Sequence, residues 1–129
     1  MLENTTILQT MGGFKLYLYR EGKSEGTEKA YIRDIEYFKE FLKNKLNNKI
    51  RYVNQITLVE IRQYKDYMLS LIEANEMKRT TVNRKFNALK TYFHFLEQEY
   101  GFKNIIKNDK FGNKKTSINS RNSIPEILN

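Results

Sequence analysis

Residues 78–96 read KRTTVNRKFNALKTYFHFL, and this stretch decides the fold class. Its large apolar side chains are spaced four, three, four and three residues apart, which is the repeat of one face of an α-helix. We expect this helix to begin at Thr80 or Thr81 and to end near Tyr100, because Gly101 tolerates the left-handed conformation that often terminates helices. The predicted apolar stripe consists of Val82, Phe86, Leu89, Phe93 and Leu96.

The same stretch is basic on one side only. Residues 78–94 hold five Lys or Arg and no Asp or Glu. A helix fits the major groove of DNA, where Arg pairs with guanine and Asn with adenine, and its N-terminal N–H groups can meet phosphate. The alternative is an ordinary solvated face, although such faces usually mix both signs of charge. At about 100° per residue, the residues opposite the stripe are Thr80, Arg84, Asn87 and Thr91, flanked by Asn83 and Lys90.

Two helices are predicted in the first half of the chain. The first covers only about residues 14–20, because Gly12 and Gly13 interrupt the apolar pattern before it. The second begins at Ser24 or Thr27, either of which can cap a helix, and runs to about Leu46. Its outward side alternates acids and bases, including Asp34, which indicates a solvated face with local pairing.

One more helix begins at Thr57, which forms a capping box with Glu60 three residues later. No segment has the period of a strand, so the sequence predicts an all-α fold of four helices. We expect a core that contains Tyr31, Ile35, Phe38, Leu42, Ile61, Met68, Leu71, Val82, Phe86, Leu89 and Phe93.

Composition excludes several classes of protein. With 129 residues the chain suits one small domain. It has no cysteine, so disulfides and thiolate metal sites are excluded, and its one histidine, His94, reads as an ordinary surface residue. There is no metal or cofactor motif and no small-molecule site. The chain also lacks a signal peptide and any apolar run of about 20 residues, so we expect a cytoplasmic protein without a membrane partner.

The net charge of +8 is concentrated in two segments, the basic helix and residues 103–121. Clustered positive charge suggests a polyanionic partner, most often nucleic acid. Residues 103–123 are polar and rich in Asn and Ser, which indicates a flexible linker. Within it, Lys114 and Lys115 would lie along a DNA backbone.

Two stretches together resemble the tyrosine recombinases, the phage-integrase family. Residues 14–42, FKLYLYREGKSEGTEKAYIRDIEYFKEFL, resemble the opening of the family's N-terminal core-binding domain, and residues 79–96 resemble its last long helix. Residues 53–68 fit the helix between them, and the final IPEILN resembles the lead into a catalytic domain. The matching residues are Phe14, Leu18, Gly22, Ser24, Thr27, Tyr31, Asp34, Phe38 and Leu42, then Thr81, Asn83, Arg84, Leu89, Lys90, Phe93 and Leu96.

The resemblance implies a small SAM-like orthogonal bundle of four to five helices. In the family this bundle is one jaw of a C-shaped clamp around double-stranded DNA, and it contacts other recombinase protomers when they assemble on DNA. We therefore divide the chain into an N-terminal arm (1–13), a core-binding domain (14–102) and a basic linker (103–129). The candidate DNA-binding residues are Ser24, Thr27, Lys29, Arg33, Lys78, Arg79, Thr80, Asn83, Arg84, Asn87, Lys90, Thr91, Lys114 and Lys115.

The sequence departs from the family in two places. The family often has proline where Ile105 follows Asn104, and its cleavage chemistry uses two arginines, a His-x-x-Arg motif and a tyrosine. Here the only histidine stands in HFLE. We therefore expect a fragment or a truncated gene that binds DNA and cleaves nothing. The alternatives are a stand-alone helix-turn-helix-like regulator and a helical module for an acidic protein partner.

Overall fold

The computed structural model describes residues 4–46 and 49–107, and this part of the chain is built from helices. They are α1 (Ile7–Arg20), α2 (Glu25–Lys45), α3 (Leu58–Glu73) and α4 (Arg79–Tyr100), with a short 3-10 helix, Val53–Gln55, before α3. The described residues contain no strand. The predicted all-α fold is confirmed.

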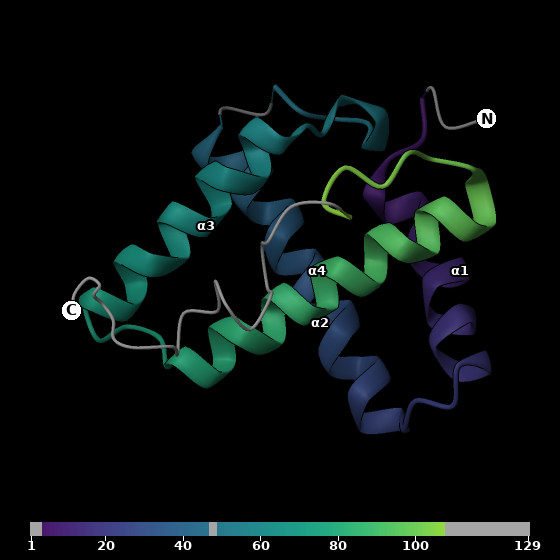
Figure 1. Cartoon of the computed structure of the whole chain (residues 1–129), viewed down its shortest axis with the longest axis horizontal. Coiled ribbons are helices and arrows are strands. Elements are labelled where there is room, and N and C mark those ends of the chain that lie inside the picture. The colour runs from purple at the N-terminus through teal and green to yellow at the C-terminus, as the bar shows by residue number, and fades with distance from the viewer. Residues whose placement is uncertain (1–3, 47–48, 108–129) are drawn as a thin grey trace.

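Helices α2 and α4 cross at the centre of the molecule, with α1 on one side and α3 on the other (Figure 1). α2 packs against each of the other three helices, and α1 also contacts α4. The stretch between α2 and α3 is tied to the N-terminal segment, where the Val53 N–H donates to the Thr5 carbonyl at 2.8 Å. The two helices that the sequence assigned to DNA are therefore in direct contact.

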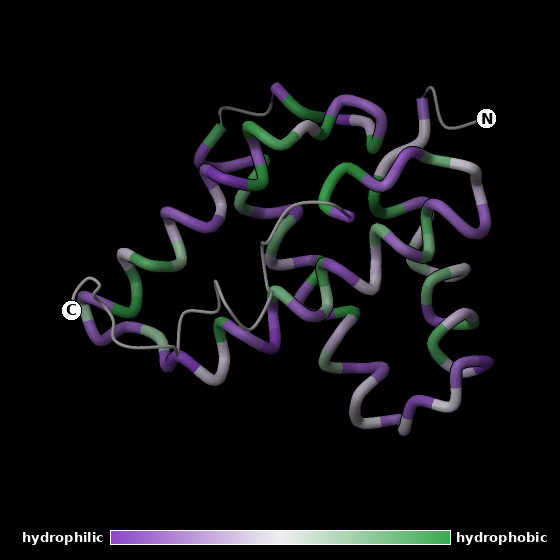
Figure 2. The backbone as a smooth tube through the Cα atoms, viewed as in Figure 1, coloured by the Kyte–Doolittle hydropathy of each residue, from purple (hydrophilic) through white to green (hydrophobic). Residues whose placement is uncertain are grey.

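Every helix contributes apolar side chains to the core, and apolar and polar residues are interspersed along every helix in Figure 2. Most of the predicted core is confirmed. Tyr31 and Leu71 are only half-buried, and they pack at the rim. The buried members of the predicted set are Ile35, Phe38, Leu42, Ile61, Met68, Val82, Phe86, Leu89 and Phe93.

Helix α4 buries a second stripe that the sequence analysis missed. Lys85, Ala88, Tyr92 and Phe95 are all buried and recur at three, four and three residues. The rings of Tyr92 and Phe95 each lie 5.3 Å from that of Phe14 in α1. Because α4 packs against both α1 and α2, it is buried over a wider arc than a surface helix. Its exposed part is correspondingly narrow.

The predicted helix ends agree closely with the observed ones. The Ser24 side chain accepts from the Thr27 N–H at the start of α2, and Thr57 and Glu60 form the predicted capping box on α3. Gly101 ends α4 with φ of 72°, the left-handed conformation expected there. The predicted cap of α4 was wrong, because that helix begins at Arg79 and no side chain caps it.

The first helix is longer than predicted. It begins at Ile7 instead of residue 14, so residues 7–13, which we assigned to an N-terminal arm, form its first two turns. Thr6 and Gln9 provide a capping box, and Ile7 and Met11 are buried. A glycine in a helix costs roughly 1 kcal/mol relative to alanine. This cost is offset by the burial of apolar side chains such as Ile7 and Met11 in the same turns.

The chain packs on the core for several residues beyond α4. Ile106 is buried, and the Phe102 ring lies 6.0 Å from that of Phe93. Residues 103–107, which we placed in the linker, therefore include a core residue. The rest of the predicted linker, with Lys114 and Lys115, lies outside the described residues.

Candidate nucleic-acid interface

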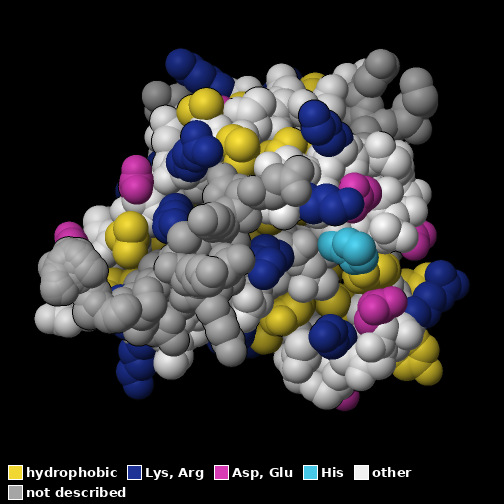
Figure 3. Space-filling view, in the orientation of Figure 1, with side chains coloured by type: hydrophobic (Ala, Val, Ile, Leu, Met, Phe, Trp, Pro, Cys, Tyr) yellow, Lys and Arg dark blue, Asp and Glu magenta, His cyan; other side chains and the backbone are white. Residues whose placement is uncertain are grey.

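The exposed side of α4 carries cations, amides and hydroxyls. Thr80, Arg84, Asn87, Lys90 and His94 are exposed along this side. No Asp or Glu occurs in α4 before Glu97. Figure 3 shows Lys and Arg side chains spread over the face of the molecule on which α4 crosses α2. We call these five residues, with the half-buried Asn83 and Thr91 beside them, the α4 polar stripe.

Among residues 4–46 and 49–107, the acid that is hydrogen-bonded to this stripe is a buried one. Asp34 of α2 lies beneath α4, with its side chain 0 % exposed. Arg84 donates two hydrogen bonds to it, from Nε to Oδ2 at 3.0 Å and from Nη2 to Oδ1 at 2.8 Å. Lys85 adds a third, from Nζ to Oδ1 at 3.0 Å. The prediction that Asp34 belongs to a solvated face is therefore wrong.

The two cations of this cluster have different surroundings. The Lys85 side chain is only 9 % exposed, and its ammonium lies 4.2 Å from the centre of the Tyr37 ring. The Arg84 side chain remains 43 % exposed. Its hydrogen bonds to Asp34 raise the pKa of Arg84 above its ordinary value, and partial burial opposes that rise. Lys85 is thus a core residue, whereas Arg84 has one end in the core and the other at the surface.

Arg84 keeps donors available after binding Asp34. A guanidinium has five N–H groups in one plane, and the pair with Asp34 uses one from Nε and one from Nη2. The remaining donors, two on Nη1 and one on Nη2, lie in the same plane at the end of the guanidinium. A carboxylate, a phosphate or a guanine edge can be bound there in a second fork-like contact.

The start of α2 was predicted to contribute four residues. The Ser24 and Thr27 hydroxyls are hydrogen-bonded to each other at 3.0 Å as part of the helix cap. Lys29 pairs with Glu25 at 3.5 Å, and both side chains are largely exposed, so this pair is weak. Arg33 is exposed next to Asp34. These side chains are on the surface, but only Arg33 is adjacent to the Asp34–Arg84–Lys85 cluster.

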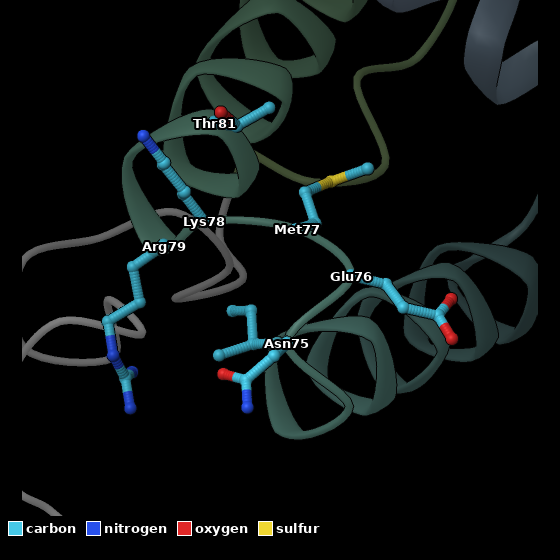
Figure 4. A pocket seen from close by; sticks show the side chains of 7 residues that line it. Asn75, Glu76, Met77, Lys78, Arg79 and Thr81 are labelled. Carbon is cyan, nitrogen blue, oxygen red and sulfur yellow. The ribbon is translucent and has the colours of Figure 1, made fainter.

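An open hollow lies where α3 is joined to α4. Its lining includes Met77, Lys78, Arg79 and Thr81. The side chains of Lys78 and Arg79 point away from that of Glu76 (Figure 4). The Lys78 side chain, at the N-cap of α4, makes no capping hydrogen bond. The predicted residues Lys78 and Arg79 therefore stand at the N-terminal end of the α4 polar stripe.

Other kinds of site are not found in the described part of the chain. It contains no group of three or more His, Cys, Asp or Glu that could hold a metal ion. His94 is exposed, as predicted, and its ring lies 6.5 Å from that of Tyr17. Among the same residues, no helix is long and apolar enough to cross a membrane.

The comparison with protein families agrees with this architecture. Residues 12–100 match the phage integrase, N-terminal SAM-like domain. The chain belongs to this family. The match covers all but the first turn or so of α1, the whole of α2 and α3, and α4 to its last residue. The resemblance that the sequence analysis drew from residues 14–42 and 79–96 is confirmed.

The curated relatives of this SAM-like domain are tyrosine recombinases. The chain is 32 % identical over 96 residues to tyrosine recombinase XerC of Listeria innocua, which is 74 % of this chain and 28 % of that protein. It is 35 % identical over 72 residues to tyrosine recombinase XerC of Staphylococcus epidermidis, or 56 % of this chain and 22 % of that one. The chain thus spans less than a third of the length of these relatives. No solved structure matches it significantly.

Proposed function

We propose that this SAM-like domain binds double-stranded DNA through the α4 polar stripe, as one jaw of the DNA clamp of a tyrosine recombinase. The observation that carries the proposal is the distribution of acids around α4. From Arg79 to His94 its surface has no carboxylate of its own, and the carboxylate that the described residues bring into an ion pair with it, Asp34, is buried beneath two cations. A phosphate that approaches α4 therefore meets net positive charge, and a carboxylate at the same place would repel it.

The stripe has the dimensions and donors for the major groove. α4 has 22 residues and crosses in front of α2 in Figure 1, and an α-helix fits the groove of B-DNA. Asn83 and Asn87 lie one turn apart and can read adenine edges. Lys78, Arg79 and Lys90 are placed to contact phosphates, and so are Lys29 and Arg33 of α2. Contacts of this kind set the register of the protein on DNA and carry no sequence information themselves.

In this proposal the chain supplies binding and no strand cleavage. The family match covers an N-terminal domain only, and the sequence has no His-x-x-Arg motif. Incubation with supercoiled or nicked DNA should leave no covalent protein–DNA adduct. In the complete assembly the same domain would also contact other protomers on the DNA. With one jaw alone, affinity should be near the non-specific range, with a Kd on the order of 10⁻⁴–10⁻⁶ M at physiological salt.

The test is a fluorescence-anisotropy titration of a labelled duplex at several salt concentrations. Each phosphate neutralised contributes about −0.9 to the slope of log K against log salt. Lys90→Ala should weaken binding and reduce the slope by about one such unit. Lys43→Ala is the matched control, because it changes net charge equally. Nine residues from Asp34 at about 100° each, Lys43 lies on the opposite side of α2.

The two substitutions separate the proposal from its alternative. If the α4 polar stripe binds DNA, Lys90→Ala loses affinity and Lys43→Ala keeps the wild-type slope. Equal losses of DNA affinity in both variants would mean that binding depends on net charge alone and uses no defined face of the domain. Absence of wild-type binding at low salt would overturn the proposal and favour an acidic protein partner.

A further inference from the structure

The cluster beneath α4 contains one more cation than neutralisation requires. Asp34 is completely buried, and a buried carboxylate without a partner is strongly destabilising. Lys85 neutralises that charge, since it is itself buried and donates to Oδ1 at 3.0 Å, but the hydrogen bond to Oδ2 comes from Arg84 Nε. Arg84 therefore brings a second positive charge to a pair that is already neutral. A neutral donor would satisfy Oδ2 as well, so the second charge needs another explanation.

The geometry of Arg84 supplies one. Arginine has a long side chain with many rotamers, and an exposed arginine in water occupies several of them. Here two hydrogen bonds, Nε to Oδ2 and Nη2 to Oδ1, fix both the position and the plane of the guanidinium. A single hydrogen bond would leave it free to rotate. Because the carboxylate is fully buried while the Arg84 side chain stays 43 % exposed, we place the donors that Asp34 does not bind toward the surface.

We propose that Asp34 is a positioning residue for DNA binding: it holds the Arg84 guanidinium so that its outer edge meets a DNA phosphate. The proposal rests on the DNA-binding function proposed above and assigns a role to a residue that itself touches no DNA. It also changes the role predicted for Arg84. With its Nε edge bound to Asp34, Arg84 serves as a fixed backbone contact, and base reading falls to Asn83 and Asn87.

Preorganisation of Arg84 and long-range electrostatics predict opposite changes in DNA affinity for the substitution Asp34→Asn. Asp34→Asn removes a negative charge and raises the net charge from +8 to +9, so long-range attraction to DNA should increase. The amide, however, offers one acceptor and one donor where the carboxylate offers two acceptors. Arg84 loses its bidentate partner and must be ordered on binding. An immobilised flexible side chain costs enough to weaken affinity by about 2- to 10-fold.

The experiment is a double-mutant cycle between Asp34→Asn and Arg84→Ala, with DNA affinity measured by anisotropy at fixed salt. In Arg84→Ala, Lys85 still neutralises Asp34, but Oδ2 loses its donor, so the fold of this variant is first checked by circular dichroism. We expect Asp34→Asn to bind more weakly than wild type. In the Arg84→Ala background it should have no effect or increase affinity slightly. A purely structural role for Asp34 would instead weaken binding equally in both backgrounds.

Asp34→Asn alone leaves the buried Lys85 without its charged partner. A second variant therefore tests the proposal if Asp34→Asn unfolds the domain. Asp34→Asn combined with Lys85→Met removes both buried charges and restores the wild-type net charge. Neutral replacements of a buried pair are often tolerated, and thermal unfolding followed by circular dichroism establishes whether this one folds. Positioning predicts a 2- to 10-fold loss of affinity relative to Lys85→Met, about the cost of one ordered side chain.

The outcomes separate this inference from the proposed function. Equal or tighter binding of the folded Asp34 variants, with wild type and Lys85→Met binding normally, would overturn the positioning role and leave DNA binding in place. Failure of wild type to bind any duplex at low salt would overturn the proposed function itself.

Discussion

Tyr64→Phe should make this domain more stable. The Tyr64 side chain is buried in the core, where its ring lies 4.9 Å from that of Phe38 and 5.1 Å from that of Phe41. Its hydroxyl has no hydrogen-bond partner among the described residues. Leaving a buried polar group unsatisfied costs about 1–3 kcal/mol. Phenylalanine keeps the ring contacts and removes that cost.

Tyr92→Phe is the matched control, because it removes the same atom from a buried tyrosine that has a partner. The Tyr92 hydroxyl lies 2.7 Å from Thr10 Oγ1, which is also 2.7 Å from the Ile7 carbonyl. The single hydroxyl proton of Thr10 goes to that carbonyl, so Tyr92 is the donor in the other bond. Its loss should cost about 1 kcal/mol.

The assay is unfolding by guanidinium chloride, with helix content followed by circular dichroism. We expect Tyr64→Phe to gain about 1 kcal/mol, since the small gap left by the oxygen offsets part of the desolvation gain. This corresponds to a rise in Tm of about 4–8 °C for a domain of this size. The slope of the unfolding free energy against denaturant concentration should stay unchanged, because the surface exposed on unfolding is the same. If Tyr64→Phe is destabilised as much as Tyr92→Phe, the Tyr64 hydroxyl has a partner and the reasoning is wrong.

Three further predictions concern the core, a helix cap and alkaline pH. Phe86→Ala should cost about 3–5 kcal/mol through lost burial and the cavity left behind, and a loss below about 1 kcal/mol in the same assay would contradict its place in the core. Thr57→Ala should cost about 1 kcal/mol and speed amide exchange in the first turn of α3, whereas unchanged exchange there would show that the capping box contributes little. Burial raises the pKa of both Tyr64 and Tyr92. The folded state therefore keeps both protonated where the unfolded chain ionises, and stability should fall as pH rises above about 10. Tyrosinate absorbance should show these two ionising only with unfolding, and their titration in the folded protein near pH 10 would refute this.

Local signals in the sequence were sufficient for most of the fold. Thr57 with Glu60, Ser24 and Gly101 mark helix ends through interactions within a few residues, so each could be identified without knowing the tertiary structure. The same is true of the stripe that includes Phe86. The start of α1 was missed because Gly12 and Gly13 lower helix propensity, while the compensating burial depends on contacts with a distant helix.

The candidate site was less predictable, because its chemistry depends on partners far apart in the chain. Asp34 and Arg84 are separated by 50 residues, and no pattern in either helix shows that they meet. The burial of Lys85 was not predicted, because the sequence analysis assigned α4 one apolar stripe and the helix has two. A buried lysine is rare and needs a buried acid. The position of Asp34, beside the apolar residues of α2, was the one signal in the sequence that could have pointed to its pair with Lys85.

A one-sidedly basic helix can therefore arise for two separate reasons, and α4 combines them. Of the five cations in residues 78–94, Lys85 belongs to the core, because it is buried and donates to the buried Asp34, which would otherwise be paired with Arg84 alone. Lys78, Arg79 and Lys90 are exposed, so their side chains can be replaced without leaving an unpaired charge in the core. Arg84 belongs to both groups, since it is bound to the buried acid and still 43 % exposed. Counting charges along the sequence cannot separate these cases. Substituting them one at a time can, because loss of Lys85 should first appear in stability and loss of Lys90 only in affinity for DNA.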